Sequence, residues 1–146
     1  SGARLMSLRH PENKMSKSSD DVSGTIYFND SRDLIIKKFK STVTDSQNEI
    51  KYDLESKPGV SNLIEIYSSI HGIELKETEK QFKEFNYGDF KLAVAEAVIN
   101  YLEPLAENFQ SISDSEVDSA IDNNLKLAKV SAELTISEIE TALGID

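Results

Sequence analysis

The sequence predicts a mainly α-helical protein, with a bundle of four to five helices preceded by a short α/β segment. After about residue 30, apolar residues recur every three or four positions, as they do on one face of a helix. Before residue 30, short apolar and β-branched runs flank a polar loop rich in Ser, Lys and Asp. The 146 residues, 38% of them hydrophobic, suffice for one globular core.

Composition excludes several classes of site. The chain has no cysteine, which excludes disulfides, thiolate zinc sites and a cysteine nucleophile. No apolar run is long enough to span a membrane and no secretory leader is visible, so we expect a cytoplasmic protein. Residues 1–60 carry ten basic and nine acidic side chains, whereas residues 61–146 carry six and seventeen. The acidic carboxyl-terminal part is therefore not a general electrostatic binder of RNA.

The amino-terminal segment is expected to be extended. Residues 4–8 (RLMSL) predict a short strand that ends before Pro11, and residues 13–24 predict a polar loop. Residues 25–28 (TIYF) are consistent with a short strand or an extended turn. Because a lone strand leaves its backbone polar groups without partners, we expect the chain to be part of a longer protein.

The first predicted helices follow turn and cap signals. One helix begins after the candidate caps at residues 29–31 and turns Leu34, Ile35 and Phe39 to one side. Lysines 37, 38 and 40 in its last turns complement the helix dipole. The next helix follows Pro58, with Ser61 or Asn62 as its cap. Its apolar stripe is Leu63, Ile66, Tyr67 and Ile70.

Three further helices complete the bundle. Gly72 is a left-handed terminator for the second helix, and a short helix follows over residues 75–85. A long helix over residues 87–109 contains Pro104, which should kink or divide it. Ser113 and Glu116 predict a capping box for the last helix. These apolar stripes are assigned to the core, which for the long helix comprises Phe90, Val94, Ala97, Val98, Tyr101, Leu105 and Phe109.

The segment Lys14–Ser18 (KMSKS) is the candidate for chemistry. Two ammonium groups on flexible stems, with hydroxyls and backbone amides between them, suit a polyphosphate. Taken alone, the same residues also fit an ordinary polar linker. His10 is read as a surface residue and His71 as a cap for helical carbonyls, and we predict no metal site in the chain.

The surroundings of this segment favour the phosphate-binding interpretation. The run GARLMSL, followed after five positions including Pro11 by KMSKS, resembles the second signature of class I aminoacyl-tRNA synthetases. Residues 37–46 (KKFKSTVTDS), 57–68 (KPGVSNLIEIYS) and 87–98 (YGDFKLAVAEAV) resemble tryptophanyl-tRNA synthetases in particular. One departure is Ser19, which precedes Asp20 and Asp21 where many relatives have aspartate directly.

The resemblance implies a carboxyl-terminal portion of such an enzyme. Residues 1–30 would be the end of the Rossmann-like catalytic core with its loop, and residues 31–146 a helical tRNA- and anticodon-binding domain. The whole enzyme would act on tryptophan, ATP with Mg²⁺, and tRNA(Trp), as a homodimer. The first family signature and the tryptophan pocket are not matched, so we expect this chain alone to be an inactive monomer with no bound cofactor.

The resemblance also implies the site residues. Lys14 and Lys17 would be catalytic, contacting the ATP phosphates and the developing pyrophosphate. The full implied ATP-binding set is Leu5, Lys14, Met15, Ser16, Lys17 and Ser18, with Leu5 on the adenine side. Two alternatives remain open at this stage: a tyrosyl-tRNA synthetase fragment, and a stand-alone helical module that binds RNA or protein.

Overall fold

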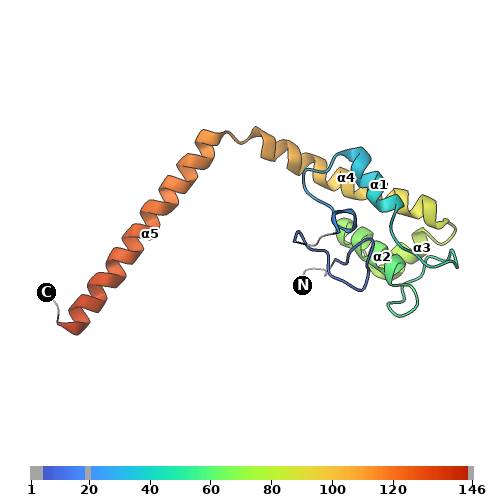
Figure 1. Ribbon diagram of the computed structural model, residues 1–146, viewed down its shortest axis with the longest axis horizontal. Coiled ribbons are helices and arrows are strands. Elements are labelled where there is room, and N and C mark those ends of the chain that lie inside the picture. Colours follow the sequence, from blue (N-terminus) through green and yellow to red (C-terminus); the bar gives the residue numbers. More distant parts are fainter. Residues whose placement is uncertain (1–4, 19–20, 145–146) are drawn as a thin grey trace. The chain divides into compact units, whose positions relative to one another are not determined.

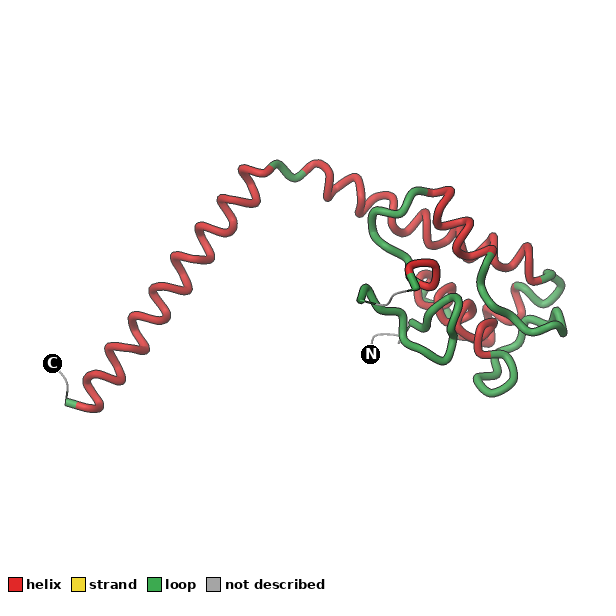
Figure 2. Tube along the Cα trace, in the orientation of Figure 1, coloured by secondary structure: helices red, strands yellow, loops and turns green. Residues whose placement is uncertain are grey.

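The computed structural model describes residues 5–18 and 21–144. The described residues form five α-helices and one 3₁₀ turn (Figures 1 and 2). The turn is η1 (Val22–Gly24), and the helices are α1 (Arg32–Lys40), α2 (Pro58–His71), α3 (Leu75–Gln81), α4 (Tyr87–Ser111) and α5 (Asp114–Leu143). The predicted mainly helical fold class is confirmed.

The chain divides into two compact units, Ser1–Ala106 and Glu107–Asp146. The first unit contains the amino-terminal loops, the first three helices and most of α4. Its core gathers apolar side chains from all these segments, so residues 5–18 and 21–30 fold against the helices. The predicted division at residue 30, between the end of a catalytic core and a helical tRNA-binding domain, stays a prediction. The buried core residues are Leu8, Ile35, Phe39, Ile50, Val60, Leu63, Ile64, Ile66, Tyr67, Phe82, Tyr87, Phe90, Val94, Ala95, Ala97, Val98 and Ile99.

The start of α2 differs from the prediction. Lys57 is the N-cap and Pro58 occupies the first turn, where its missing N–H needs no partner. The predicted caps Ser61 and Asn62 are wrong, because both lie inside the helix and are almost completely buried. The adjacent Gly59 fits because a Cβ there would collide with the backbone carbonyl of Val43. The helix end agrees with the prediction, since Gly72 adopts φ 64°.

Several predicted core positions are exposed. Leu34 in α1 is exposed, although Ile35 and Phe39 are buried. Phe85, the last apolar residue of the helix predicted over residues 75–85, lies past the end of α3 and is also exposed. In α4 the buried stripe ends at Ile99, so the predicted core residues Tyr101, Leu105 and Phe109 are exposed, and Pro104 is accommodated inside the helix.

The second unit consists of the end of α4 and α5. The predicted capping box at the start of α5 is present, with the Ser113 hydroxyl and the Glu116 carboxylate each accepting from the other's backbone N–H. Gly144, at φ 65°, ends the helix. No residue of α5 is buried, so its predicted apolar stripe is not part of the core.

The amino-terminal segment contains little sheet structure. Within residues 5–18 and 21–30, the ladder pairing is a single antiparallel bridge between Met6 and Lys14. Thr25 is extended and follows η1, so residues 25–28 form an extended turn rather than a strand.

Candidate functional site

The segment that carries Lys14 is held by backbone pairing with the residues that precede it. Besides the Met6–Lys14 bridge, the Ser7 N–H donates to Asn13 O at 2.8 Å and the Met15 N–H donates to Leu5 O at 3.0 Å. These bonds make a short hairpin whose second arm enters the KMSKS segment. Lys14 and Lys17 are both exposed, so their ammonium groups are accessible to a charged ligand.

The serines of this segment are linked to one another. The Ser16 and Ser18 hydroxyl oxygens lie 3.1 Å apart, and the Ser18 N–H donates to the Ser16 hydroxyl at 3.4 Å. The Ser16 carbonyl accepts from the Thr25 hydroxyl at 3.1 Å. The hydrogen bond from Thr25, which is buried, ties the exposed loop to the folded body of the unit.

A shallow pocket of about 300 Å³ opens beside the loop. Five of the six predicted ATP-binding residues line it, and Ser18 is the one that does not. The lining residues are Leu5, Lys14, Met15, Ser16, Lys17, Thr25 and Ile26. Two cationic side chains and an apolar wall thus share one concave surface, an arrangement that suits an anion attached to an apolar or aromatic group.

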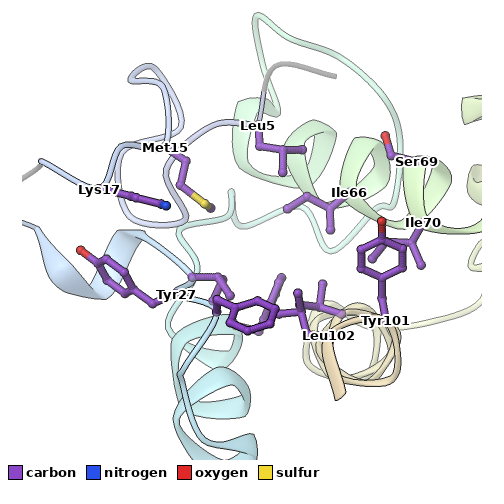
Figure 3. Close-up of a pocket in the computed structure, with 13 residues that line it drawn as sticks. Leu5, Met15, Lys17, Tyr27, Ile66, Ser69, Ile70, Tyr101 and Leu102 are labelled. Atoms are coloured by element: carbon purple, nitrogen blue, oxygen red, sulfur yellow. The ribbon is translucent and has the colours of Figure 1, made fainter. Parts of the chain in front are cut away.

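A second, larger pocket of about 430 Å³ adjoins the first and shares Leu5, Met15, Lys17 and Ile26 with it. In Figure 3, Met15 and Lys17 lie on one side of this pocket, and Ile66, Ile70, Tyr101 and Leu102 lie on the other. The second pocket is therefore built from the loop, residues 26–28 and helices α1, α2 and α4. Its apolar lining includes side chains, such as that of Tyr101, that the sequence had assigned to the core.

The segment after the loop approaches the hairpin closely at Gly24. This residue is buried, and its carbonyl accepts from the Leu8 N–H at 2.9 Å. A Cβ at Gly24 would collide with the Ser7 hydroxyl, so no other residue fits without a local shift. Sequence reasoning missed this role, because the six glycines are scattered and form no motif.

Asn62 and Lys38 are two further residues whose roles the sequence did not predict. Asn62 was expected to cap α2, and Lys38 was expected to complement the dipole of α1. Both are buried and form hydrogen bonds with the segments on either side of the loop. The sequence did contain one signal for their burial, which is their position beside the apolar stripes of their helices. Asn62 directly precedes Leu63, and Lys38 directly precedes Phe39.

The two histidines have the predicted positions. His10 is exposed, with Nδ1 3.4 Å from Glu12, and the ring of His71 lies with Nδ1 3.0 Å from the Tyr67 carbonyl oxygen. Over the described residues, no group of three or more His, Asp or Glu side chains is placed to hold a metal ion. In the same part of the chain, no helix combines the length and hydrophobicity needed to cross a membrane.

Comparison with known proteins decides the family. The family described as "tRNA synthetases class I (W and Y)" matches residues 2–103, which is most of the chain and includes the loop. The chain belongs to this family. The pocket beside the KMSKS segment lies within the residues that the family match covers.

The individual relatives that match this chain are named as enzymes specific for tryptophan. A tryptophan–tRNA ligase of Oceanobacillus iheyensis is 46% identical over 145 residues, and that of Halalkalibacterium halodurans is 41% identical over 145 residues. Each match covers 99% of this chain and 44% of the relative. The predicted resemblance to tryptophanyl-tRNA synthetases is confirmed.

A solved structure supports the same relationship. The crystal structure of tryptophanyl-tRNA synthetase from Mycoplasma pneumoniae matches with a TM-score of 0.81 and 28% sequence identity. The match covers 98% of this chain and 44% of that one. The chain therefore spans less than half the length of these synthetases.

Proposed function

We propose that this chain is the carboxyl-terminal portion of a tryptophan–tRNA ligase. The whole enzyme would activate tryptophan with ATP to form tryptophanyl-adenylate and pyrophosphate, and then transfer the amino acid to tRNA(Trp). The proposal is supported by relatives named for this activity, which match 99% of the chain. The observation that carries it is the pocket in which Lys14 and Lys17 meet Leu5 and Met15.

Lys14 and Lys17 would be the catalytic residues of this portion. When the α-phosphate of ATP is attacked by the tryptophan carboxylate, negative charge grows on the departing pyrophosphate. Ammonium groups beside that charge stabilise the transition state more than the bound ATP, and this difference accelerates the reaction. The exposure of both lysines lets their long stems follow the moving phosphates.

The other residues of the predicted site would bind rather than react. Leu5 offers an apolar contact for the face of the adenine, and Met15 and Ser16 would lie along the nucleotide with their backbone. Ser18 would help to hold the loop closed through its hydrogen bonds with Ser16. Mg²⁺ would arrive with ATP as part of the substrate and be held by its phosphates, and we assign it no ligand among the described residues.

The helical residues 31–146 would dock tRNA(Trp) and include its anticodon-binding surface. Because residues 61–146 carry a strong excess of acidic side chains, RNA would be held by a few local contacts rather than by a broad basic surface. The whole enzyme would be a cytoplasmic homodimer, as expected for an enzyme that supplies translation. The portion alone would be an inactive monomer.

Amino-acid-dependent exchange of pyrophosphate into ATP tests the proposal. The longer enzyme that contains this sequence should catalyse exchange with tryptophan and not with tyrosine, whereas the chain alone should catalyse neither. Exchange with tyrosine only would show a tyrosyl-tRNA synthetase instead. Absence of exchange with any amino acid in the longer protein would favour a stand-alone binding module and overturn the proposal.

A further inference from the structure

The KMSKS loop is connected to the helices at two places by buried polar side chains. Upstream, the hairpin arm containing Met6 contacts α2, and downstream, the segment containing Thr25 contacts α1. Each contact is made through backbone groups of the loop segments. Such contacts fix the position of the backbone, and this position in turn fixes the point from which each exposed lysine side chain extends.

The upstream contact is made by Asn62, which is 1% exposed. Its Oδ1 accepts from the Met6 N–H at 3.0 Å, and its Nδ2 donates to the Met6 carbonyl at 2.9 Å. A side-chain amide has an acceptor and donors in the same plane. Asn62 therefore forms with Met6 the two hydrogen bonds that a neighbouring β-strand would otherwise form. Since Met6 pairs with Lys14 on the hairpin, Asn62 sits one step from the first lysine of the loop.

The downstream contact is made by Lys38, whose side chain is 5% exposed. Its Nζ donates to the Thr25 carbonyl at 2.8 Å and to the Asp30 carboxylate at 2.6 Å. The Thr25 hydroxyl in turn donates to the Ser16 carbonyl. Lys38 is thus linked through Thr25 to the centre of the loop, and Asp30 compensates its buried charge.

We propose that Asn62 and Lys38, acting through Met6 and Thr25, are positioning residues that hold the loop in the geometry required for adenylate formation. This inference rests on the proposed function. Neither side chain reaches the ligand pocket, since neither is among its lining residues. They act by fixing the backbone from which Lys14 and Lys17 extend, and small displacements of charged groups from the reacting phosphates reduce the rate strongly.

Four substitutions in the longer enzyme that contains this sequence separate positioning from general stability. Asn62→Ala removes the upstream contact, and Thr25→Val removes only the hydroxyl that reaches Ser16, with little change of shape. Thr25→Ser keeps that hydroxyl and serves as the conservative rescue. Ser61→Ala is the matched control for Asn62, because the Ser61 hydroxyl is equally buried in α2 but accepts from the Asp53 N–H instead.

Steady-state kinetics of tryptophan-dependent pyrophosphate exchange provide the readout. Asn62→Ala and Thr25→Val should each lower kcat roughly 10- to 100-fold while leaving the KM for tryptophan within about twofold. Thr25→Ser should stay close to the unsubstituted enzyme. Ser61→Ala should lower the thermal midpoint but not kcat, because its lost hydrogen bond does not involve the loop.

Two results would overturn the inference and leave the proposed function standing. If Thr25→Val, a variant expected to fold, has the kcat of the unsubstituted enzyme, the link from Lys38 to the loop does not position it. If Asn62→Ala loses no more activity than Ser61→Ala, the upstream contact is merely structural. Absence of tryptophan-dependent exchange in the unsubstituted enzyme would instead overturn the proposed function and this inference with it.

Discussion

The hydroxyl group of Tyr87 lies 2.8 Å from both carboxylate oxygens of Asp45. The ammonium group of Lys57, whose side chain is 3% exposed, lies 3.3 Å from one of the same oxygens and 3.3 Å from the Tyr87 hydroxyl. This triad joins the loop after α1, the residue before α2 and the first residue of α4. The charges of Asp45 and Lys57 compensate each other. Removing Asp45 would leave the buried Lys57 ammonium with only the exposed Glu49 carboxylate, 3.8 Å away, as an ion-pair partner.

The triad predicts acid-dependent stability of the first unit. Burial alone would raise the pKa of Asp45, but hydrogen bonds from the Gln47 N–H, Tyr87 and Lys57 outweigh it and hold the pKa below its ordinary value of 3.8. Since the folded pKa is the lower one, the stability from Asp45 is complete above pH 3.8 and is lost as pH falls through the folded pKa. Asp45→Asn should cost about 2 kcal/mol at pH 7.

Denaturant unfolding measured from pH 7 downwards checks this prediction. The difference between the unsubstituted chain and Asp45→Asn should shrink as the solution becomes more acidic than pH 3.8. Glu55→Gln, at an exposed carboxylate of the same loop region, is the control and should change little at any pH. A difference that stays constant down to low pH would contradict the account.

The close approach of α2 to Val43 predicts the effect of Gly59→Ala. Alanine is the better helix former by about 1 kcal/mol, but its Cβ would overlap the Val43 carbonyl oxygen. We expect a net loss of about 2 kcal/mol in the free energy of unfolding.

Gly72→Ala is the comparison for this variant. A Cβ at Gly72 meets no atom within 4 Å, so only the left-handed backbone opposes it, at a cost of about 1 kcal/mol. If Gly59→Ala is neutral or stabilising, the packing of α2 against Val43 is looser than described.

The capping box predicts the behaviour of α5. Hydrogen bonds from the Ser113 N–H and hydroxyl hold the pKa of Glu116 below its ordinary value of 4.5. The Glu116 half of the capping box should therefore be complete above pH 4.5 and be lost as pH falls through the lower folded pKa, whereas the hydrogen bond from the Glu116 N–H to the Ser113 hydroxyl remains. Amide hydrogen exchange over residues 114–120 should accelerate in Ser113→Ala, which removes about 1 kcal/mol of capping. Equal protection in both chains would contradict this.

The sequence predicted the helices better than it predicted burial. Apolar spacing and turn residues located all five helices of the described residues, although the caps predicted for α2 were wrong. The local signals at Gly72, Ser113 and Glu116 were correct, because these interactions involve residues near one another in the chain. Burial depends on which elements meet. Tyr101 continues the apolar stripe of α4 but lies beyond the region that the other helices cover, and every apolar side chain of α5 is exposed. Periodicity alone contains no such information.

The candidate site shows the same limit. The resemblance singled out Lys14, Lys17 and four neighbouring residues as an ATP-binding set. The structure places all of this set except Ser18 around one pocket. The sequence predicted Asn62 as a helix cap and Lys38 as a complement to the helix dipole, and not as residues that contact the segments beside the loop. Their partners Met6 and Thr25 lie 56 and 13 positions away in the sequence. Contacts over such separations appear only when the fold is known.

The most direct test of the central claim is the effect of Lys17→Ala on tryptophan-dependent pyrophosphate exchange in the longer enzyme. Lys37→Ala, at an exposed lysine of α1 outside the pocket, is the matched control. We predict that Lys17→Ala lowers kcat by roughly 10²–10³-fold and leaves tryptophan binding nearly unchanged, whereas Lys37→Ala leaves exchange intact. Equal activity of the two variants would contradict the assignment of the loop to the ATP phosphates.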